Sequence, residues 1–399
     1  RCCFVSHSEQ LGGAGLCASL IRQSVEMHGV DTILRSRLVA KPEDIAGVFL
    51  YWLRRLDNAF RVRLLRSLLF VVQGHTRFSN TGLLPSPFFL YGHGCELIHV
   101  HWFGHETLSL QSLISRRIPI VVTVHDSWLF NRGLSHLEEE DRSLATTCKS
   151  SIGYKILAKI VDLKKYSFIT KPNVHFVFPS RELRRVCISN DPRFEEINTS
   201  IIPNPVAPRF FKKYDSDNVS VEFSERYLLF GLSGNFWEKH KGGDIVFDCL
   251  VELSHQGFLH GVKLIVFGDD NQQLSIPGVE IVNMGFCSQS TLASLYGLAS
   301  LTLFPSRIEP FGMVGAESLV MRTPVVTFSN VGMSEFIAHK QTGYITKPGD
   351  KEDFKAGILY CLENENALKS NLEQSQFDSL TMKSVGRAYC KIYKKVLEC

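Results

Sequence analysis

The chain has 399 residues, a length that predicts two or three domains. Its 44% hydrophobic and 21% charged residues are typical of a soluble globular protein, and a net charge of +4 is too small to indicate nucleic-acid binding. No run of about 18 apolar residues occurs, so we expect no transmembrane helix. The 11 cysteines show no short disulfide framework, which indicates reduced thiols and a cytoplasmic location.

The N-terminal stretch predicts a strand, a glycine-rich turn, a helix and a second strand. Cys2 to Ser6 is a short apolar run, Leu16 to His28 has helical spacing, and Val30 to Leu34 is apolar again. The turn, with Gly13 and Gly15, formally matches a dinucleotide fingerprint, but the acid expected at the end of the second strand is absent. Two interpretations stay open: a tight turn with positive φ, or backbone amides that let a phosphate or sugar approach closely.

Residues 43 to 72 form a predicted amphipathic helix with a wide apolar face and a basic face. Five arginines lie in residues 54–66 against a single acid, Asp57. Such a helix can pack its apolar face on a core, or it can lie on an anionic membrane surface. Both interpretations stay open at this point.

Histidines mark the ends of the next two predicted strands. His99 and His101 share one face of the strand Leu97 to Trp102. A metal site would need further ligands at suitable spacing, and because none is evident we predict no metal. His125 and Asp126 follow a run of β-branched residues. The carboxyl ends of parallel strands face the ligand crevice, so His125 is a candidate site residue, with a structural role in the loop as the alternative.

A proline-rich and then polar stretch divides the chain in two. Residues 200–208 contain three prolines, and the polar residues 212–220 follow. We therefore expect an N-terminal domain at 1–208, a linker at 209–225 and a C-terminal domain at 226–380. A helix at 381–399 ends the sequence, and packing against the N-terminal domain is one option for it.

The second half alternates apolar strands with helical patterns. The predicted strands are residues 227–233, 262–268, 279–284, 299–304 and 325–328, and the predicted helices include residues 244–256 and 289–298. Because strands alternate with helices in both halves, each half is predicted to form a Rossmann-like layer around a parallel sheet.

The stretch from Pro305 to Asn330 combines two acids with a helix start. Glu309 lies in a loop that breaks at Pro310, a helix is expected to open near Phe311, and Glu317 follows one to two turns in. A helix N-terminus that follows a buried strand predicts an α/β site at which a ligand meets the helix.

Several motifs occur in an order that resembles the retaining nucleotide-sugar glycosyltransferases of family 4, which are group 1 glycosyl transferases. The matching stretches are Gly12-Gly13, His125-Asp126, Ile202-Pro203-Asn204, Lys241-Gly242, Val266-Phe267-Gly268, Met284-Gly285-Phe286, Pro305-Ser306, and Glu309 to Glu317 spaced as E-x7-E, then Thr323 to Val326. The resemblance implies the α/β GT-B fold, with two Rossmann-like domains whose parallel sheets face a central cleft.

The resemblance also implies a role for each matching position. Glu309 would contact the donor sugar, Lys241 would bind the leaving diphosphate, and His125 would hydrogen-bond the sugar and stabilise positive charge in the transition state. Glu317 would hold the ribose hydroxyls and Phe286 would line the base pocket. The implied donor-binding set is Gly13, Asn235, Lys239, Lys241, Phe286, Glu309, Phe311, Gly312, Met313, Val314 and Glu317.

One position departs from the family pattern. The family has an arginine where this chain has Asn235, so one cation for the diphosphate is missing. Lys239 would replace it, but a point ammonium lacks the forked geometry of a guanidinium.

The implied reaction is a retaining hexosyl transfer from a nucleotide sugar to a glycan or lipid-linked glycan acceptor, in the synthesis of bacterial envelope polysaccharide. The nucleotide sugar is a substrate, and neither a cofactor nor a metal is expected, because no D-x-D motif lies at a strand end. The cytoplasm is the expected location, with peripheral attachment to the membrane through residues 43 to 72. Two alternatives stay open: a catalytically inactive nucleotide-sugar-binding protein, to which Asn235 points, and a nucleotide-sugar epimerase.

Overall fold

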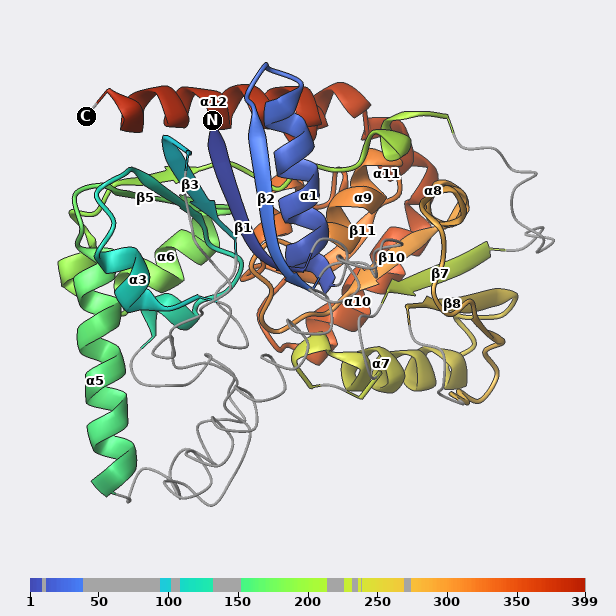
Figure 1. Cartoon of the computed structure of the whole chain (residues 1–399). Coiled ribbons are helices and arrows are strands. Elements are labelled where there is room, and N and C mark those ends of the chain that lie inside the picture. The colour runs from blue at the N-terminus through green and yellow to red at the C-terminus, as the bar shows by residue number, and fades with distance from the viewer. Residues whose placement is uncertain are drawn as a thin grey trace, which may run out of the picture. The chain divides into compact units, whose positions relative to one another are not determined.

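The computed structural model of the chain describes residues 1–8, 12–38, 94–101, 108–131, 152–213, 226–231, 236–237, 239–268 and 274–398. The chain divides into two compact units: unit 1 is Arg1–Pro203 with Val385–Cys399, and unit 2 is Asn204–Ser384 (Figure 1). The helix predicted at 43–72 and Asn235 lie outside the described residues. None of the described helices is long and apolar enough to cross a membrane.

Unit 1 is built on a six-stranded parallel sheet with the strand order β2-β1-β3-β4-β5-β6. The strands are β1 (Cys2–Ser8), β2 (Thr32–Leu38), β3 (Leu97–Val100), β4 (Ile120–Thr123), β5 (Val174–Phe178) and β6 (Thr199–Ile201). The helices are α1 (Gly12–Glu26), α3 (Leu110–Ile114), η1 (Trp128–Phe130), α5 (Ile152–Ile169), α6 (Arg181–Ser189) and η2 (Pro192–Phe194).

The central strands of this sheet are buried because helices cover both faces. Every residue of β3, β4 and β5 is buried, as the nearly continuous apolar runs of these strands predict. The prediction for β2 was wrong at both ends: the strand begins at Thr32 and continues through Arg35 to Leu38. Among the described strands β2 lies at the edge of the sheet and pairs with β1 alone, so polar side chains fit there.

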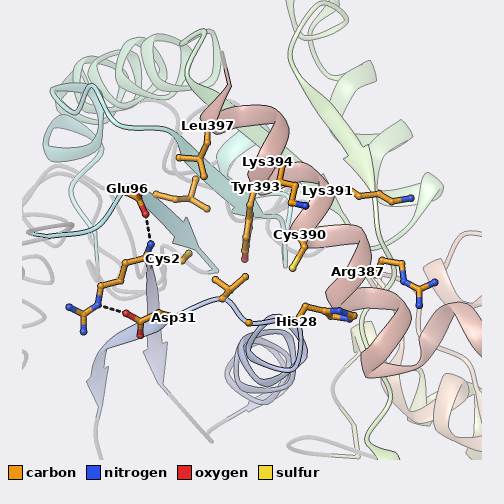
Figure 2. Close-up of a pocket in the computed structure, with 14 residues that line it drawn as sticks. Cys2, His28, Asp31, Glu96, Arg387, Cys390, Lys391, Tyr393, Lys394 and Leu397 are labelled. Carbon is orange, nitrogen blue, oxygen red and sulfur yellow. Dashed lines mark hydrogen bonds and ion pairs between the residues drawn. The ribbon is translucent and has the colours of Figure 1, made fainter.

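The last helix, α12 (Met382–Leu397), contributes its residues from Val385 onward to unit 1. Val385, Tyr389 and Tyr393 are buried in one apolar cluster with Cys2 and Phe4 of β1. Figure 2 shows Tyr393 and Cys390 on the side of α12 that faces Cys2. Residues from both ends of the sequence therefore form one core.

Unit 2 is built on a second six-stranded parallel sheet with the order β12-β11-β10-β7-β8-β9. The strands are β7 (Arg226–Gly231), β8 (Val262–Phe267), β9 (Ile281–Asn283), β10 (Leu301–Phe304), β11 (Val325–Phe328) and β12 (Gly343–Thr346). The helices are η3 (Pro208–Phe211), η5 (Lys239–Lys241), α7 (Gly243–His255), α8 (Gln289–Leu298), α9 (Met313–Val320), η6 (Gly332–Phe336), α10 (Lys351–Glu363), α11 (Glu365–Asn371) and η7 (Gln374–Leu380).

The strand order of unit 2 is that of a Rossmann fold, with the reversal between β7 and β10. These two strands are hydrogen-bonded neighbours, and Leu303 of β10 pairs with Phe230 of β7. In open parallel sheets ligands bind outside the carboxyl ends of the strands at such a reversal. We therefore expect a ligand site of this unit in the segments that follow β7 and β10.

Candidate functional site

Two segments of unit 2 meet at the carboxyl ends of β7 and β10. The turn 239–243 follows β7 and leads into α7, and the loop 305–312 follows β10 and leads into α9. Lys241 Nζ and Glu309 Oε2 lie 2.8 Å apart and form an ion pair between the two segments. The side chains are 23% and 20% exposed, so both charges are largely withdrawn from solvent but remain accessible.

Gly242 allows the turn to approach the loop this closely. Its φ of +74° lies in the left-handed region, and a Cβ there would stand 2.2 Å from the carbonyl oxygen of Pro305. Any larger side chain would combine backbone strain with a clash against main-chain atoms. The glycine thus lets the backbone of the turn pack directly on the start of the loop, next to Lys241.

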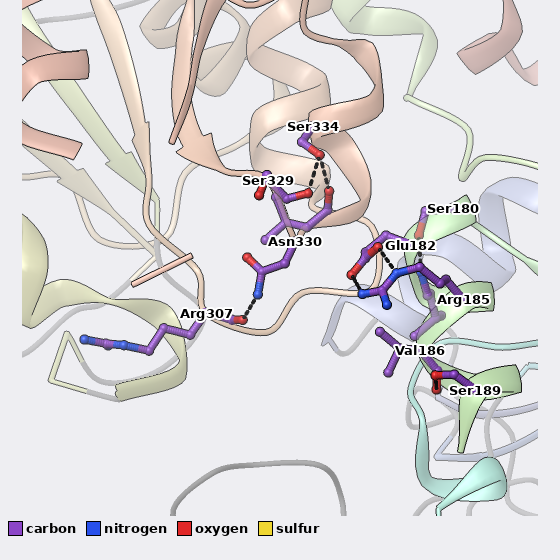
Figure 3. Close-up of polar contacts among 11 residues, drawn as sticks. Ser180, Glu182, Arg185, Val186, Ser189, Arg307, Ser329, Asn330 and Ser334 are labelled. Atoms are coloured by element: carbon purple, nitrogen blue, oxygen red, sulfur yellow. Dashed lines mark hydrogen bonds and ion pairs between the residues drawn. The ribbon is translucent and has the colours of Figure 1, made fainter. Parts of the chain in front are cut away.

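Arg307 holds the loop between two other parts of unit 2. Its guanidinium binds both carboxylate oxygens of Asp244, at 2.8 and 2.7 Å, and its backbone N–H donates to the carbonyl of His240. Burial raises the pKa of Asp244, but the hydrogen bonds from Arg307 outweigh it and hold that pKa below its usual value. On the other side, Asn330 Nδ2 donates to the carbonyl of Arg307 at 2.9 Å (Figure 3).

The helix α9 starts directly after the loop. Gly312 is its N-cap with φ +99°, and Phe304 and Met333 lie so close that a Cβ would contact them at 2.9 and 2.8 Å. The first amides of a helix, here those of Met313 and Val314, have no partner within the helix and can bind an anion. Phe311, by contrast, is buried, and only its backbone is placed at the helix start.

Glu317, the second acid of the pair, is buried in α9 and 8% exposed. Its Oε2 accepts a hydrogen bond of 3.1 Å from the hydroxyl of Tyr296 in α8. Burial raises the pKa of Glu317 to about 8, although the Tyr296 hydrogen bond lowers it, so the carboxyl carries a proton at neutral pH. Burial, together with the nearby Glu317 carboxyl, raises the pKa of Tyr296 as well.

The remaining predicted residues of unit 2 lie in exposed positions. Phe286 follows β9, and 80% of its surface is exposed, which leaves its ring free to stack on a ligand. Lys239 lies at the start of η5, and its carbonyl accepts a hydrogen bond from the Arg307 guanidinium.

In unit 1 the predicted residues Gly13 and His125 follow the carboxyl ends of β1 and β4. The interpretation of Gly13 as a turn with positive φ is wrong, because it lies in the first turn of α1 with no φ in the left-handed region. The space at its Cβ position is open to 4 Å, so a ligand can approach the backbone there.

His125 Nε2 lies 3.1 Å from His101 Nδ1. Burial lowers the pKa of His125 to about 4, although the carboxylate of Asp126 raises it. Among the described residues no three His, Cys, Asp or Glu side chains are grouped so that they could hold a metal ion.

A buried lysine supports the segment after His125. Lys165 of α5 donates to the carbonyl oxygens of Trp128 and Asn131, at 2.6 and 3.1 Å, and its ammonium lies 4.1 Å from the centroid of the Trp128 ring. Burial lowers the pKa of Lys165 to about 7, against opposing effects of Asp162 and Asp126.

A pocket of about 650 Å³ lies in unit 1 at the amino ends of β1 and β3. Figure 2 shows Cys2, His28 and Tyr393 around it, together with Arg387 and Lys394 of α12. It contains none of the predicted site residues, and it lies at the opposite edge of the sheet from Gly13 and His125. It is therefore separate from the chemistry that the sequence predicts.

The sequence analysis missed the roles of four residues that contact the predicted residues or support the segments that carry them: Arg307, Tyr296, His101 and Lys165. Each one acts on a residue distant in the sequence, such as Tyr296 on Glu317 or Lys165 on Trp128. A charged or aromatic residue in an apolar stretch, such as Lys165 in α5, was the only local signal for any of them.

Comparisons with known proteins show which proteins the chain is similar to. Residues 228–364 match the family model described as Glycosyl transferases group 1. An uncharacterized glycosyltransferase of Methanocaldococcus jannaschii is 25% identical over 406 aligned residues, which cover 96% of this chain and 93% of the relative.

Two solved structures are similar over the full length. A sucrose-phosphate synthase from Thermosynechococcus elongatus has a TM-score of 0.67 at 14% identity, with 100% of this chain and 99% of that chain covered. HepE from Anabaena, in complex with UDP and glucose, has a TM-score of 0.63 at 18% identity, with 99% of both chains covered. The GT-B fold that the sequence predicts is thereby confirmed.

Proposed function

We propose that this chain, whose residues 228–364 match the group 1 glycosyl transferases, moves a hexosyl group from a nucleotide-sugar donor to an acceptor with retention of configuration, as in family 4. The observation that carries this proposal is the ion pair of Lys241 and Glu309, 2.8 Å apart at the strand-order reversal of unit 2. It puts a cation and an acid where a Rossmann-like sheet binds its ligand.

The diphosphate of the donor is the leaving group, and its departure needs compensating positive charge. Lys241 supplies an ammonium, and the amides of Met313 and Val314 at the start of α9 supply donors and the positive end of a helix dipole. Lys239, from the same turn, is proposed to stand in for the arginine that the family has at position 235.

Glu309 and Lys241 neutralise one another when no donor is bound, so neither charge is buried alone. A diphosphate would compete for the ammonium and free the Glu309 carboxylate for the sugar. The carboxylate then lies beside the carbon at which positive charge develops as the bond to the leaving oxygen breaks.

The nucleoside half of the donor is assigned to Glu317 and Phe286. A protonated Glu317 offers one hydrogen-bond donor as well as acceptors to the ribose hydroxyls, whereas an ionised carboxylate would only accept. The exposed ring of Phe286 would stack on the base. HepE was solved with UDP, and a uridine nucleotide is the first donor to test.

The acceptor is assigned to unit 1, where Gly13 and His125 follow the carboxyl ends of β1 and β4. The C1–phosphate bond breaks and a bond from C1 to the acceptor oxygen forms on the same face. The acceptor proton passes to an oxygen of the leaving diphosphate, so no carboxylate base is needed. Glycans or lipid-linked glycans of the bacterial envelope are the proposed acceptors.

The test begins with a thermal-shift panel of nucleoside diphosphates, which selects the donor class. Release of nucleoside diphosphate from the matching sugar donor is then measured for wild type, Lys241→Ala and Glu309→Ala. Each substitution should lower turnover by at least about 100-fold, the scale of losing one charge-stabilising group. Lys351→Ala is the matched control, because this lysine also pairs with a glutamate of unit 2, Glu252, but belongs to no proposed site.

Turnover at the wild-type rate in both Lys241→Ala and Glu309→Ala would contradict the assignment. Stabilisation by a nucleotide without transfer to any acceptor would instead indicate an inactive binding protein, and an epimer formed from the donor alone would indicate an epimerase. The anomeric configuration of the product, read by NMR, decides retention.

A further inference from the structure

The strands β3 and β4 are neighbours in the sheet of unit 1, and each is followed by a histidine. His101 Nδ1 and His125 Nε2 are 3.1 Å apart, and the two rings are nearly parallel, with an angle of 25° between their planes. Two nitrogens at this distance share one proton, because one of them must donate and the other must accept.

Both rings are neutral at neutral pH. Burial lowers the pKa of His101 well below its usual value, and the neighbouring His99 and His125 lower it further. Burial likewise lowers the pKa of His125 and keeps its ring unprotonated, although the carboxylate of Asp126 raises that pKa. A neutral imidazole carries a single proton, so the shared hydrogen bond fixes which nitrogen of each ring has it.

Two neighbouring rings hold the ring of His101 in place. Phe4 stacks on it at a centroid distance of 5.4 Å and an angle of 17°, and the ring of His99 lies 4.1 Å away. His99 itself cannot exchange hydrogen bonds with His101, because Tyr393 and Thr123 occupy its two nitrogens at 2.7 and 2.8 Å. Packing thus directs His101 Nδ1 at His125.

The other nitrogen of His101, Nε2, decides the direction of the shared bond. It is completely buried and has no hydrogen-bond partner in the described part of the chain. If His125 donated, His101 Nε2 would carry a proton that nothing accepts. If His101 donates from Nδ1, Nε2 is only an unpaired acceptor, and orphaned buried donors are the rarer and costlier case.

We propose that His101 is a positioning residue that donates from Nδ1 to His125 Nε2 and so holds His125 as the tautomer with a proton on Nδ1. In this state His125 offers the substrate a hydrogen-bond donor and has no basic nitrogen free. This inference rests on the proposed function, in which His125 meets the donor sugar. A donating His125 fits a reaction in which the leaving phosphate takes the acceptor proton.

The tautomer is measured in the full-length protein without any ligand. Two-bond ¹H–¹⁵N correlation spectra of ¹⁵N-histidine-labelled protein at pH 7 should show a protonated Nδ1 and a bare Nε2 for His125. The signal is assigned by its absence in His125→Gln. In His101→Phe the stacked ring is kept but the donor is lost, so His125 should no longer be held in this tautomer.

Two further variants separate positioning from structure. In His101→Asn the amide group lies near the place of Nδ1 and can still donate, so the wild-type tautomer should return. His175→Asn removes another buried imidazole of the same sheet, which binds Ser200 Oγ at 2.9 Å, and should leave His125 unchanged. Turnover should follow the tautomer, with kcat/KM about tenfold lower in His101→Phe than in His101→Asn, the scale of one hydrogen bond.

A protonated Nε2 on His125 in wild type, or an unchanged tautomer in His101→Phe, would overturn the role of His101. Absence of sugar transfer by the wild-type protein would refute the proposed function and leave the tautomer result standing. The two failures are therefore distinguishable.

Discussion

Replacing Glu317 with glutamine removes a buried titratable group but keeps the size of the side chain. The amide oxygen of glutamine can still accept the hydrogen bond from Tyr296 that Glu317 Oε2 accepts in wild type. What changes is the response to pH, because burial raises the pKa of Glu317 from an ordinary 4.5 to about 8.

The expected change in the free energy of unfolding follows from the difference between the pKa values of Glu317 in the folded and unfolded states. Between pH 4.5 and 8 the unfolded chain has lost the Glu317 proton and the folded chain keeps it. The folded state then binds more protons, so the free energy of unfolding falls as pH rises, by about 1.4 kcal/mol per pH unit. From pH 5 to pH 8, wild type should lose about 3.5 kcal/mol relative to Glu317→Gln.

The assay compares urea denaturation of both proteins at pH 5, 6, 7 and 8. Unfolding of unit 2 is followed by hydrogen exchange with mass spectrometry on peptides that contain β10 and β11. The two proteins can differ in their free energy of unfolding by a constant amount at every pH. The prediction concerns only how that difference changes with pH. Tyr296→Phe is the matched control: it removes the hydrogen bond but keeps the titrating carboxyl, so the pH dependence of wild type should persist.

A difference between wild type and Glu317→Gln that stays within about 0.5 kcal/mol from pH 5 to pH 8 would refute this reasoning. It would mean that Glu317 is ionised in the folded protein, and that the proposed donation from its carboxyl to a ribose hydroxyl is wrong.

Two other substitutions test how the site segments are held. Lys165→Met should leave the carbonyls of Trp128 and Asn131 without the lysine donor. The free energy of unfolding of wild type, relative to that of the variant, should rise from pH 7 to pH 10, because the unfolded chain binds the Lys165 proton more tightly than the folded chain does. Urea denaturation at both pH values measures this difference. Gly242→Ala should destabilise unit 2 by more than about 2 kcal/mol and lower donor turnover. Gly257 is the matched control, because it has a similar φ of +81° and open space around it. Gly257→Ala should therefore cost only the backbone strain and keep wild-type turnover.

Secondary structure was predictable wherever local signals were strong. The helix at Gln289–Leu298 and the strand at Val325–Phe328 have the predicted boundaries, since a serine N-cap opens one and a proline precedes the other. β2 was harder, because an edge strand needs fewer apolar residues and Arg35 looked like its end. The α/β class followed from the alternation of strands and helices, and the GT-B fold from the resemblance.

The sequence predicts the candidate site as a set of residues but not as a set of contacts. Motif spacing identifies Lys241 and Glu309, yet no local pattern indicates that they pair across 68 positions of sequence. Burial of Glu317 against Tyr296 depends on the packing of α8 on α9, which a single sequence does not reveal. The functional roles of all these residues stay predictions until the variants are measured.

The return of α12 to unit 1 has a consequence for the synthesis of the chain on the ribosome. Unit 2, Asn204–Ser384, is one continuous stretch of sequence, whereas unit 1 needs residues from both sides of that stretch. The apolar cluster around Cys2 and Phe4 therefore stays incomplete until Tyr389 and Tyr393 have been synthesised and have left the ribosome. A chain whose synthesis stops near Ser384 therefore carries a first unit with uncovered apolar surface at Cys2 and Phe4, and such a surface promotes aggregation.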